Sequence, residues 1–457
     1  MSRKEKPVLS RSERELFNDV IADLKRQYLS DDRPWVVGFS GGKDSTCTLQ
    51  MVYRMLLSMT PEERVKPVHV LSSDTLVEAP VVGIRQKKIC KMISAAAEFD
   101  DIPLSVEMLR PDITDTFWVN LIGRGYPSPN KWFRWCTDRL KIKPMNKYIL
   151  ENIKRNGEVL IILGARKSES VSRSQTMTKH EIGNTKLRRH GNINGAFVYT
   201  PIQDLTEEQV WGYLDNDPSP WGDNNAELKS MYQKKDDEEI SFIIDDVSPP
   251  SGHSRFGCWV CTVVDKDKAI LSLIEDGHAE YQPLADFRDK LKRIRDDPTC
   301  RDTFRKNQRV DKFLSQFAGT EVVKEIHRGH EVSGPFLMEV RHELLRELLQ
   351  IQDELRKNVP EAELISPEEV SAIRTLWLYE GDTANAFEDS TSEGNNIDDL
   401  VTRLLRIEDD MSDLSKRVGI YKKLEQVVME YTMAAMIDEK SIDMETGRLS
   451  GGAENDD

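Results

Sequence analysis

Apolar and polar positions follow two different periodicities over the first 215 residues. Apolar residues at helical spacing predict helices at residues 13–28, 45–59 and 81–99. Short uninterrupted apolar runs predict buried strands at residues 35–39, 68–71, 104–109 and 159–163. Strands that alternate with helices indicate an α/β fold with a parallel sheet and crossover helices. Ligands of such sheets bind at the carboxyl ends of the strands.

The pattern of apolar positions changes after Thr206, and the rest of the chain is predicted to be mainly helical. Residues 335–378 and 398–438 have the pattern of long, charged, amphipathic helices. A polar segment at 382–396 separates them, and the tail is expected to be disordered. We therefore divide the chain into an α/β domain at 1–215, a mainly helical region with two cysteines at 216–334, a helical C-terminal region at 335–442 and a tail at 443–457.

The C-terminal helices are predicted to serve assembly and not catalysis. Residues 335–438 contain no cysteine, and His342 is their only histidine, so they offer little for nucleophilic chemistry. Their leucine stripes are suited either to packing on the core or to binding a partner. The polar segment between the two helices favours docking of a partner.

Length and charge limit the classes of protein to consider. With 457 residues, the chain is too long for one compact core and predicts two or three domains. Its net charge of −15 argues against non-specific nucleic-acid binding, yet residues 124–189 hold 16 Lys or Arg against 5 Asp or Glu. This basic stretch is either a solvated surface or a binding site for a polyanion. In the second case, the basic region from Arg124 to Arg189, which includes Lys186, Arg188 and Arg189, is expected to face the nucleotide cleft.

Two absences in the sequence predict a cytoplasmic protein without a membrane partner. No apolar run reaches the roughly 18 residues of a membrane span, and the N-terminus has no apolar signal segment. Six cysteines are too few for a disulfide scaffold, so clustered cysteines point to metal binding or catalysis.

The string Ser40-Gly41-Gly42-Lys43-Asp44-Ser45 follows the first predicted strand and precedes a helix. Two glycines let the backbone turn its N–H groups towards a phosphate, and the helix N-terminus favours an anion. The serines donate hydrogen bonds, Lys43 supplies charge, and Asp44 either binds Mg²⁺ or caps the helix. The spacing differs from that of the Walker loop, which disfavours an NTPase of that type. The alternative is a capped glycine turn without a ligand.

In this context the string resembles the PP-loop of the ATP pyrophosphatase superfamily, whose members cleave ATP between its α and β phosphates. Segments around Asp74, Gly164-Ala165-Arg166 and Tyr199-Thr200-Pro201-Ile202 are similar to the phosphoadenosine phosphosulfate (PAPS) reductase-like branch of that superfamily. The resemblance implies that ATP and Mg²⁺ are cofactors and that Lys43, Asp44 and Arg166 are catalytic. It implies a nucleotide site formed by Ser40, Gly41, Gly42, Lys43, Asp44, Ser45, Asp74, Glu78, Arg166, Glu169 and Arg173. Arg166, Glu169 and Arg173 also fit a surface charge cluster.

Cys258 and Cys261 form a C-x-x-C pair, which by itself fits zinc, a redox pair or an iron–sulfur cluster. Cys136 stands where PAPS reductase-like proteins carry a cysteine. Three such thiolates suit an iron–sulfur cluster of the [4Fe–4S] type. The fourth ligand is Cys300, His253 or none, and an open iron could hold a sulfur atom. Two further cysteines, Cys47 and Cys90, are expected to be buried packing residues.

The segment 254–264, SRFGCWVCTVV, is distinctive and resembles the C-component family of the Dnd DNA phosphorothioation systems, together with the segments FSGGKDSTCTLQ and RWCTDRLKIKP. The resemblance covers roughly residues 10–350. One departure is that a further cysteine, expected shortly before the C-x-x-C pair, is absent. The resemblance implies an ATP-dependent sulfurtransferase that adenylates a DNA backbone phosphate, releases pyrophosphate and inserts sulfur delivered through the cluster. Its implied partners are DNA, a cysteine desulfurase and other components of the system, including an ATPase.

Two other functions stay open. The same fold could serve a PAPS or adenylylsulfate reductase or a tRNA thiolase. A reductase would end in a flexible catalytic cysteine, and no cysteine follows Cys300. The chain could also be a non-catalytic nucleotide-binding scaffold of a DNA-modification complex. The intact phosphate loop, with Asp74 and Glu78, argues against that.

Overall fold

The computed structural model describes residues 9–169, 186–232, 258–275, 277–302, 333–380 and 382. The chain divides into two compact units, Met1–Ser366 and Pro367–Asp457, and each is described by itself. The helix predicted at 398–438 and the disordered tail predicted at 443–457 lie outside the described residues. Among the helices within them, none combines the length and the apolar character that crossing a membrane requires.

Six strands in the described part of the first unit form a sheet in the order β3-β2-β1-β4-β6-β5. Their bounds are Trp35–Gly38 for β1, Val68–Ser73 for β2, Leu104–Leu109 for β3, Val159–Ile162 for β4, Leu187–Arg189 for β5 and Ala196–Tyr199 for β6. All neighbouring pairs are parallel except β5 with β6. The predicted α/β fold with a parallel sheet is confirmed. The connections change direction where β1 lies between β2 and β4, and such a switch point is where these folds bind ligands.

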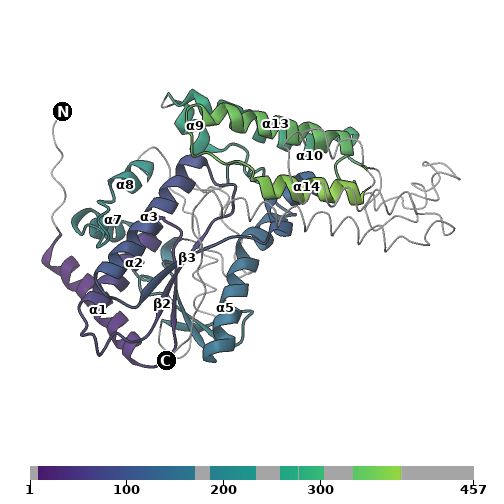
Figure 1. The fold of residues 1–457 in the computed structure, drawn as a ribbon. Coiled ribbons are helices and arrows are strands. Elements are labelled where there is room, and N and C mark those ends of the chain that lie inside the picture. Colours follow the sequence, from purple (N-terminus) through teal and green to yellow (C-terminus); the bar gives the residue numbers. More distant parts are fainter. Residues whose placement is uncertain are drawn as a thin grey trace, which may run out of the picture. The chain divides into compact units, whose positions relative to one another are not determined.

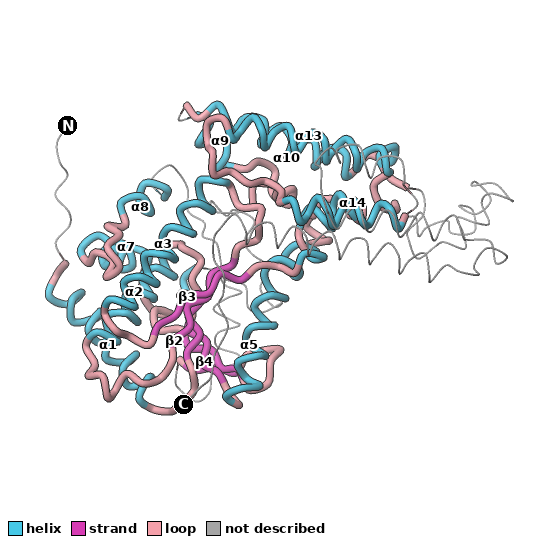
Figure 2. Tube along the Cα trace, in the orientation of Figure 1, coloured by secondary structure: helices cyan, strands magenta, loops and turns pink. Residues whose placement is uncertain are grey.

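Helices cover both faces of this sheet (Figures 1 and 2). One face carries α1 (Arg11–Leu29), α2 (Lys43–Leu57), α3 (Pro80–Phe99), α7 (Glu207–Asn216) and α8 (Ala226–Tyr232), and the other carries α5 (Lys143–Asn156). Alternate residues of the strands point to opposite faces, so Trp35 and Val37 enter the larger core while Val36 packs against Met145 and Ile149 of α5. Both faces are therefore buried, as in parallel sheets generally.

The second part of the first unit is built on a helix pair and an aromatic cluster. Helices α10 (Gln282–Arg295) and α13 (Met338–Arg356) lie side by side, joined by Lys290, whose ammonium group pairs with Glu343 and Glu347 (Figure 1). The short helix α9 (Lys268–Glu275) precedes them. Phe287 of α10 forms an aromatic cluster with Trp118 and Trp259, whose ring centroids lie 5.8–6.2 Å apart. Such contacts between aromatic rings fasten the C-x-x-C segment to the α/β domain.

The prediction of one long helix over residues 335–378 is wrong. Helix α13 ends at Arg356, and α14 (Pro367–Tyr379) belongs to the second unit. Two prolines, Pro360 and Pro367, lie in or just after the break, and proline cannot donate a backbone hydrogen bond. The connecting segment is held by Gln352, whose side-chain oxygen accepts from the backbone N–H groups of Leu364 (2.7 Å) and Ile365 (3.0 Å).

Candidate active site

The phosphate loop is a tight turn between β1 and α2. Gly41 has φ +75°, a left-handed conformation that favours glycine, and Gly42 is the N-cap of the helix. The Ser40 and Ser45 hydroxyls lie 3.0 Å apart, and the Ser45 hydroxyl donates to the Gly42 carbonyl at 3.0 Å. The loop therefore presents the N-terminus of a 15-residue helix at the carboxyl end of β1. This arrangement attracts an anion through the N–H groups of the first turn and the helix dipole.

The segment after β4 closes against this loop through Gly164 and Arg166. A Cβ atom on Gly164 would lie 2.5 Å from the Asp44 carbonyl oxygen, so the two backbones meet at a distance only glycine permits. Arg166 Nε donates to Asp44 Oδ1 at 3.0 Å, and both side chains are buried. The structure thus gives Asp44 an ion pair that the sequence did not suggest. Binding of Mg²⁺ by Asp44 stays a prediction.

Lys43 lies among groups that sequence reasoning missed. Its backbone N–H donates to the Tyr232 hydroxyl at 3.2 Å, and its ammonium nitrogen lies 5.1 Å from the centre of the Tyr232 ring. The same nitrogen is 3.6 Å from Glu207 Oε1 and 3.9 Å from Asp44 Oδ2. The Tyr232 hydroxyl therefore accepts from the Lys43 N–H group, and the Glu207 carboxylate lies beside the Lys43 ammonium group. A bound phosphate would need both of these Lys43 groups. No sequence signal links them, because Tyr232 is 189 residues from Lys43.

Asp74 and Glu78 lie in the turn after β2. Asp74 accepts from the Leu76 N–H at 3.1 Å and from Arg110 Nε at 3.0 Å. Glu78 accepts from the Thr75 N–H at 3.1 Å and from the Thr75 hydroxyl at 2.6 Å. Burial raises the pKa of Glu78, although the Thr75 hydrogen bonds act in the other direction. Both carboxylates hold this turn, and contact of either with a nucleotide stays a prediction.

The C-x-x-C segment docks on the same turn. Cys258 and Glu78 form an antiparallel bridge, and the Trp259 N–H donates to the Val77 carbonyl at 3.0 Å. The Thr75 hydroxyl lies 3.4 Å from Cys258 Sγ, and the Cys261 N–H donates to the Cys258 carbonyl at 3.0 Å. The exit of β2 therefore connects the two halves of the site, because β2 is the parallel neighbour of β1, which carries the phosphate loop.

Cys258 and Cys261 share one turn, and Cys136 lies in the short helix Trp135–Thr137. Burial raises the pKa of Cys136 to about 11, with a contribution from Cys261, and that of Cys258 to about 12, with a contribution from Cys136. The ammonium group of Lys141 acts in the opposite direction on both thiols. Cys136 thus interacts electrostatically with both cysteines of the C-x-x-C pair.

Cys300 lies in another segment, and its role as the fourth cluster ligand stays a prediction. It ends a short 3-10 helix, Pro298–Cys300, and its thiol contacts Asp297. Within the described ranges, no recorded interaction links it to the other three thiols. His253 lies outside those ranges. As expected, Cys47 and Cys90 are buried.

Three cysteines are a donor set of the kind that iron–sulfur clusters use. In the residues that the structure describes, no three His, Cys, Asp or Glu side chains are grouped to hold one metal ion. A zinc ion would draw its sulfurs to about 2.3 Å from one centre. An iron–sulfur cluster binds each thiolate through a different iron, so its ligands need not converge on one point. Cys136, Cys258 and Cys261 therefore remain the predicted ligands.

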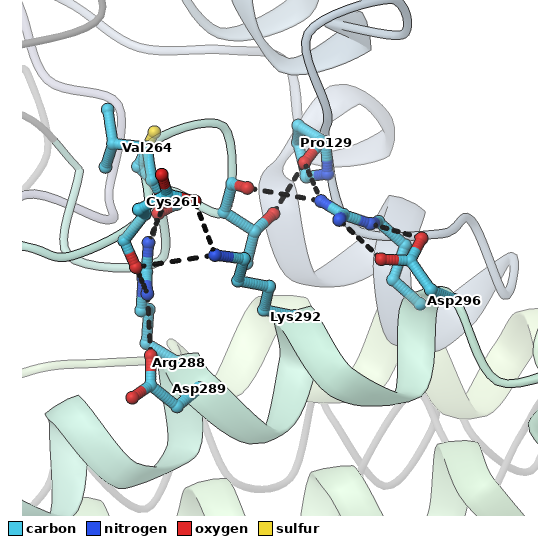
Figure 3. Close-up of polar contacts among 10 residues, drawn as sticks. Pro129, Cys261, Val264, Arg288, Asp289, Lys292 and Asp296 are labelled. Carbon is cyan, nitrogen blue, oxygen red and sulfur yellow. Dashed lines mark hydrogen bonds and ion pairs between the residues drawn. The ribbon is translucent and has the colours of Figure 1, made fainter.

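Helix α10 donates hydrogen bonds to the backbone from Cys261 onwards (Figure 3). Arg288, 2% exposed, donates to the carbonyls of Cys261 (3.0 Å), Asp265 (2.8 Å) and Val264. Arg295 Nη1 donates to the carbonyls of Thr262 and Pro129, each at 3.1 Å. One helix thus fixes the segment of Cys261 and, through Pro129, the segment that leads to Cys136. The sequence shows these arginines only as part of a charged helix.

Three sequence expectations near β4 and β5 have different outcomes. The Glu169 side chain and Arg173 lie outside the described residues. Lys186, Arg188 and Arg189 do not present their charges on one exposed face, and binding of a polyanion by the basic region stays a prediction. Arg188 is buried, and Lys186 Nζ lies 3.4 Å from Asp23 Oδ2 and donates to the Pro201 carbonyl. The cause is the edge strand β5, which runs antiparallel to β6 and directs successive residues to opposite faces.

Comparison with known proteins gives a match over the sheet and the C-x-x-C pair. Residues 34–264, just over half of the chain, match the phosphoadenosine phosphosulfate reductase domain. An uncharacterised protein of Methanocaldococcus jannaschii is 26% identical over 247 residues, which are 54% of this chain and 40% of that protein. The chain thus spans less than half of that relative.

Solved structures show distant likeness. A phosphoadenylyl-sulfate reductase from Candida auris, in complex with phosphate, has a TM-score of 0.31 at 14% identity and covers 51% of this chain and 98% of its own. A U34-tRNA thiolase from Methanococcus maripaludis, with its [4Fe-4S] cluster, has a TM-score of 0.30 at 12% identity and covers 50% of this chain and 80% of its own.

Proposed function

The chain belongs to the phosphoadenosine phosphosulfate reductase domain family, and from that premise we propose that it is an ATP-dependent sulfurtransferase of DNA phosphorothioate modification. One observation carries the proposal. The phosphate loop follows β1, and the turn that binds Cys258 follows β2, its parallel neighbour. An anion cradle and a group of thiols therefore open at the same edge of one sheet. That juxtaposition suits a reaction in which a phosphate is activated and then receives sulfur.

In the first half-reaction, the chain binds ATP and activates the acceptor. The N–H groups of the first turn of α2 hold the pyrophosphate portion, and Lys43 offsets its charge. Arg166, held by Asp44 at 3.0 Å, offsets the charge that develops on the α-phosphate. A non-bridging oxygen of the DNA phosphate attacks the α-phosphorus, and pyrophosphate leaves. The DNA phosphate then carries AMP as a leaving group.

In the second half-reaction, a sulfur nucleophile replaces AMP. A cysteine desulfurase supplies sulfane sulfur, and two electrons from thiols reduce it to hydrosulfide. Hydrosulfide attacks the DNA phosphorus, AMP departs with the original oxygen, and the thiol proton is lost to solvent. A [4Fe–4S] cluster held by Cys136, Cys258 and Cys261 would supply, at an iron without a protein thiolate, a place to hold the sulfur. The α10 arginines orient the segment of Cys261 by binding its carbonyls.

The partners follow from this chemistry and remain proposals. DNA is the acceptor, the desulfurase is the sulfur donor, and the C-terminal helical region is the docking element for the desulfurase or an ATPase component. Mg²⁺ would accompany ATP. A tRNA thiolase or a reductase of PAPS or adenylylsulfate would use the same sheet edge with a different substrate, so the identity of the substrate decides between them.

The test is a reconstituted reaction under anaerobic conditions with ATP, a sulfide source and either duplex DNA or tRNA. We expect AMP and pyrophosphate as products and, after digestion of the DNA, phosphorothioate-linked dinucleotides by mass spectrometry. Lys43→Ala should reduce both products together. Sulfur recovered only in tRNA would contradict the DNA assignment, and ADP as the sole nucleotide product would contradict the chemistry itself.

A further inference from the structure

An exposed tryptophan lies close to the thiols in the chain. The Trp132 side chain is 95% exposed, the highest fraction among the large hydrophobic side chains that the structure describes, and its neighbour Phe133 is 45% exposed. An indole ring offers about 150–250 Å² of mostly apolar surface, which gains free energy when it is covered. The proposed function leaves this residue without a role.

The turn that carries Trp132 is firmly built. The side-chain oxygen of Asn130 accepts from the backbone N–H groups of Trp132 (2.8 Å) and Phe133 (2.9 Å). Just before it, the Pro129 carbonyl accepts from the Thr262 hydroxyl at 2.6 Å and from Arg295 at 3.1 Å (Figure 3). The indole is thus held out into solvent on a rigid base, so little conformational entropy is lost when a ligand covers it.

This base is shared with the thiol site, by which we mean Cys136, Cys258 and Cys261 and the segments that carry them. Thr262 directly follows Cys261, and Cys136 comes three residues after Phe133. The surrounding sequence is basic, since residues 130–143 include five Lys or Arg and one Asp. Two of the five, Arg139 and Lys143, pair with Asp115, whereas the Lys131 side chain is exposed. An exposed ring beside positive charge matches the way in which proteins bind unstacked bases of nucleic acids.

We propose that Trp132 is a stacking platform for one base of the DNA, which places the adjacent backbone phosphate at the thiol site. The inference rests on the proposed function, because it names how the acceptor is held. Stacking on an indole is tolerant of sequence, so the platform supplies affinity and position and no sequence readout. A protein partner would need a wider apolar surface, because an interface hot spot lies inside a ring of contacts that exclude water.

The experiment measures binding of fluorescently labelled single-stranded DNA, duplex DNA and single-stranded RNA to the full chain by anisotropy, over a range of salt concentrations and without ATP or sulfide. Trp132→Ala should weaken binding roughly fivefold to a hundredfold, and Trp132→Phe should restore most of the loss. The salt slope should stay unchanged, because no charge is removed. Lys131→Ala should instead lower the slope by roughly 0.7 per lost phosphate contact on single strands.

The matched control is Phe99→Ala, since Phe99 is 89% exposed at the end of α3. It should bind DNA like the wild type. Wild-type affinity of Trp132→Ala, or no binding of any oligonucleotide by the wild-type chain, would overturn the platform. Equal losses in Trp132→Ala and Phe99→Ala would also overturn it. A loss confined to RNA would overturn the assignment to DNA. Because no turnover is needed, a failed sulfur-transfer assay together with the predicted binding losses would reject the proposed function and keep the platform.

Discussion

The phosphate loop and the thiol site open at the same sheet edge but are built in different ways. The loop consists of six consecutive residues that run from the end of β1 into the first turn of α2, and local conformation alone, such as φ +75° at Gly41, forms most of it. The thiol site is assembled from distant segments, for Thr75 and Cys258 are 183 residues apart in the chain. It stays in place because α10 and the aromatic cluster bind the cysteine segment. A locally encoded site tolerates distant changes, whereas an assembled one depends on its supports.

The largest expected effect follows from removing the support of the thiol site. Arg288→Met leaves the carbonyls of Cys261, Val264 and Asp265 without their buried donor. A hydrogen bond that involves a charged group contributes about 1.5–3 kcal/mol, so loss of three should lower the free energy of unfolding by about 3 kcal/mol or more. Denaturant titration measures the change, and iron content should fall with it.

The control for that variant is Lys292→Ala, whose partner Asp265 is 97% exposed. An exposed ion pair contributes only about 0–1 kcal/mol, so this variant should be nearly as stable as the wild type. If Arg288→Met were equally stable, the thiol site would not depend on α10, and the contrast between the two regions would be lost.

Gly164→Ala should damage the phosphate loop while sparing the thiols. The new Cβ would lie 2.5 Å from the Asp44 carbonyl oxygen, so the backbone of the loop must shift. Overpacking of this kind costs about 1–3 kcal/mol, and ATP affinity should fall tenfold or more, as measured by calorimetric titration. Gly83→Ala is the control, since its nearest neighbour would be 4.0 Å away. Unchanged ATP binding in Gly164→Ala would show that this close contact is not part of the nucleotide site.

Tyr232→Phe should have a smaller effect, in the opposite direction. Its hydroxyl accepts from the Lys43 N–H, which the proposal assigns to a phosphate oxygen. Without that competitor, ATP affinity should rise roughly twofold to tenfold, the equivalent of one hydrogen bond. Tyr53→Phe, at the other end of α2 with its hydroxyl on Asp100, should leave ATP affinity unchanged. Weaker binding by Tyr232→Phe would mean that the hydroxyl contacts the nucleotide itself.

The same contrast explains what the sequence could predict. The phosphate loop can be predicted from the sequence because its residues are contiguous. In a parallel sheet, ligands bind at the carboxyl ends of the strands, and the loop follows such an end. Arg288, Glu207 and Tyr232 cannot be predicted in this way, because packing of distant helices brings them to the site. Helix α5 was missed although Met145 and Ile149 show helical spacing, a signal that was present but not used. The break after α13 also has a sequence signal, because Pro360 interrupts the apolar stripe.

The central claim is that the two regions divide one reaction between them, and one measurement tests it directly. Pyrophosphate release and phosphorothioate formation are quantified in the same anaerobic reaction for the wild type, Lys43→Ala, Cys258→Ser and Cys47→Ser. We predict that Lys43→Ala loses both products but keeps its iron, that Cys258→Ser still releases pyrophosphate but forms no phosphorothioate, and that Cys47→Ser resembles the wild type. Phosphorothioate formation by Cys258→Ser at the wild-type level would contradict the account.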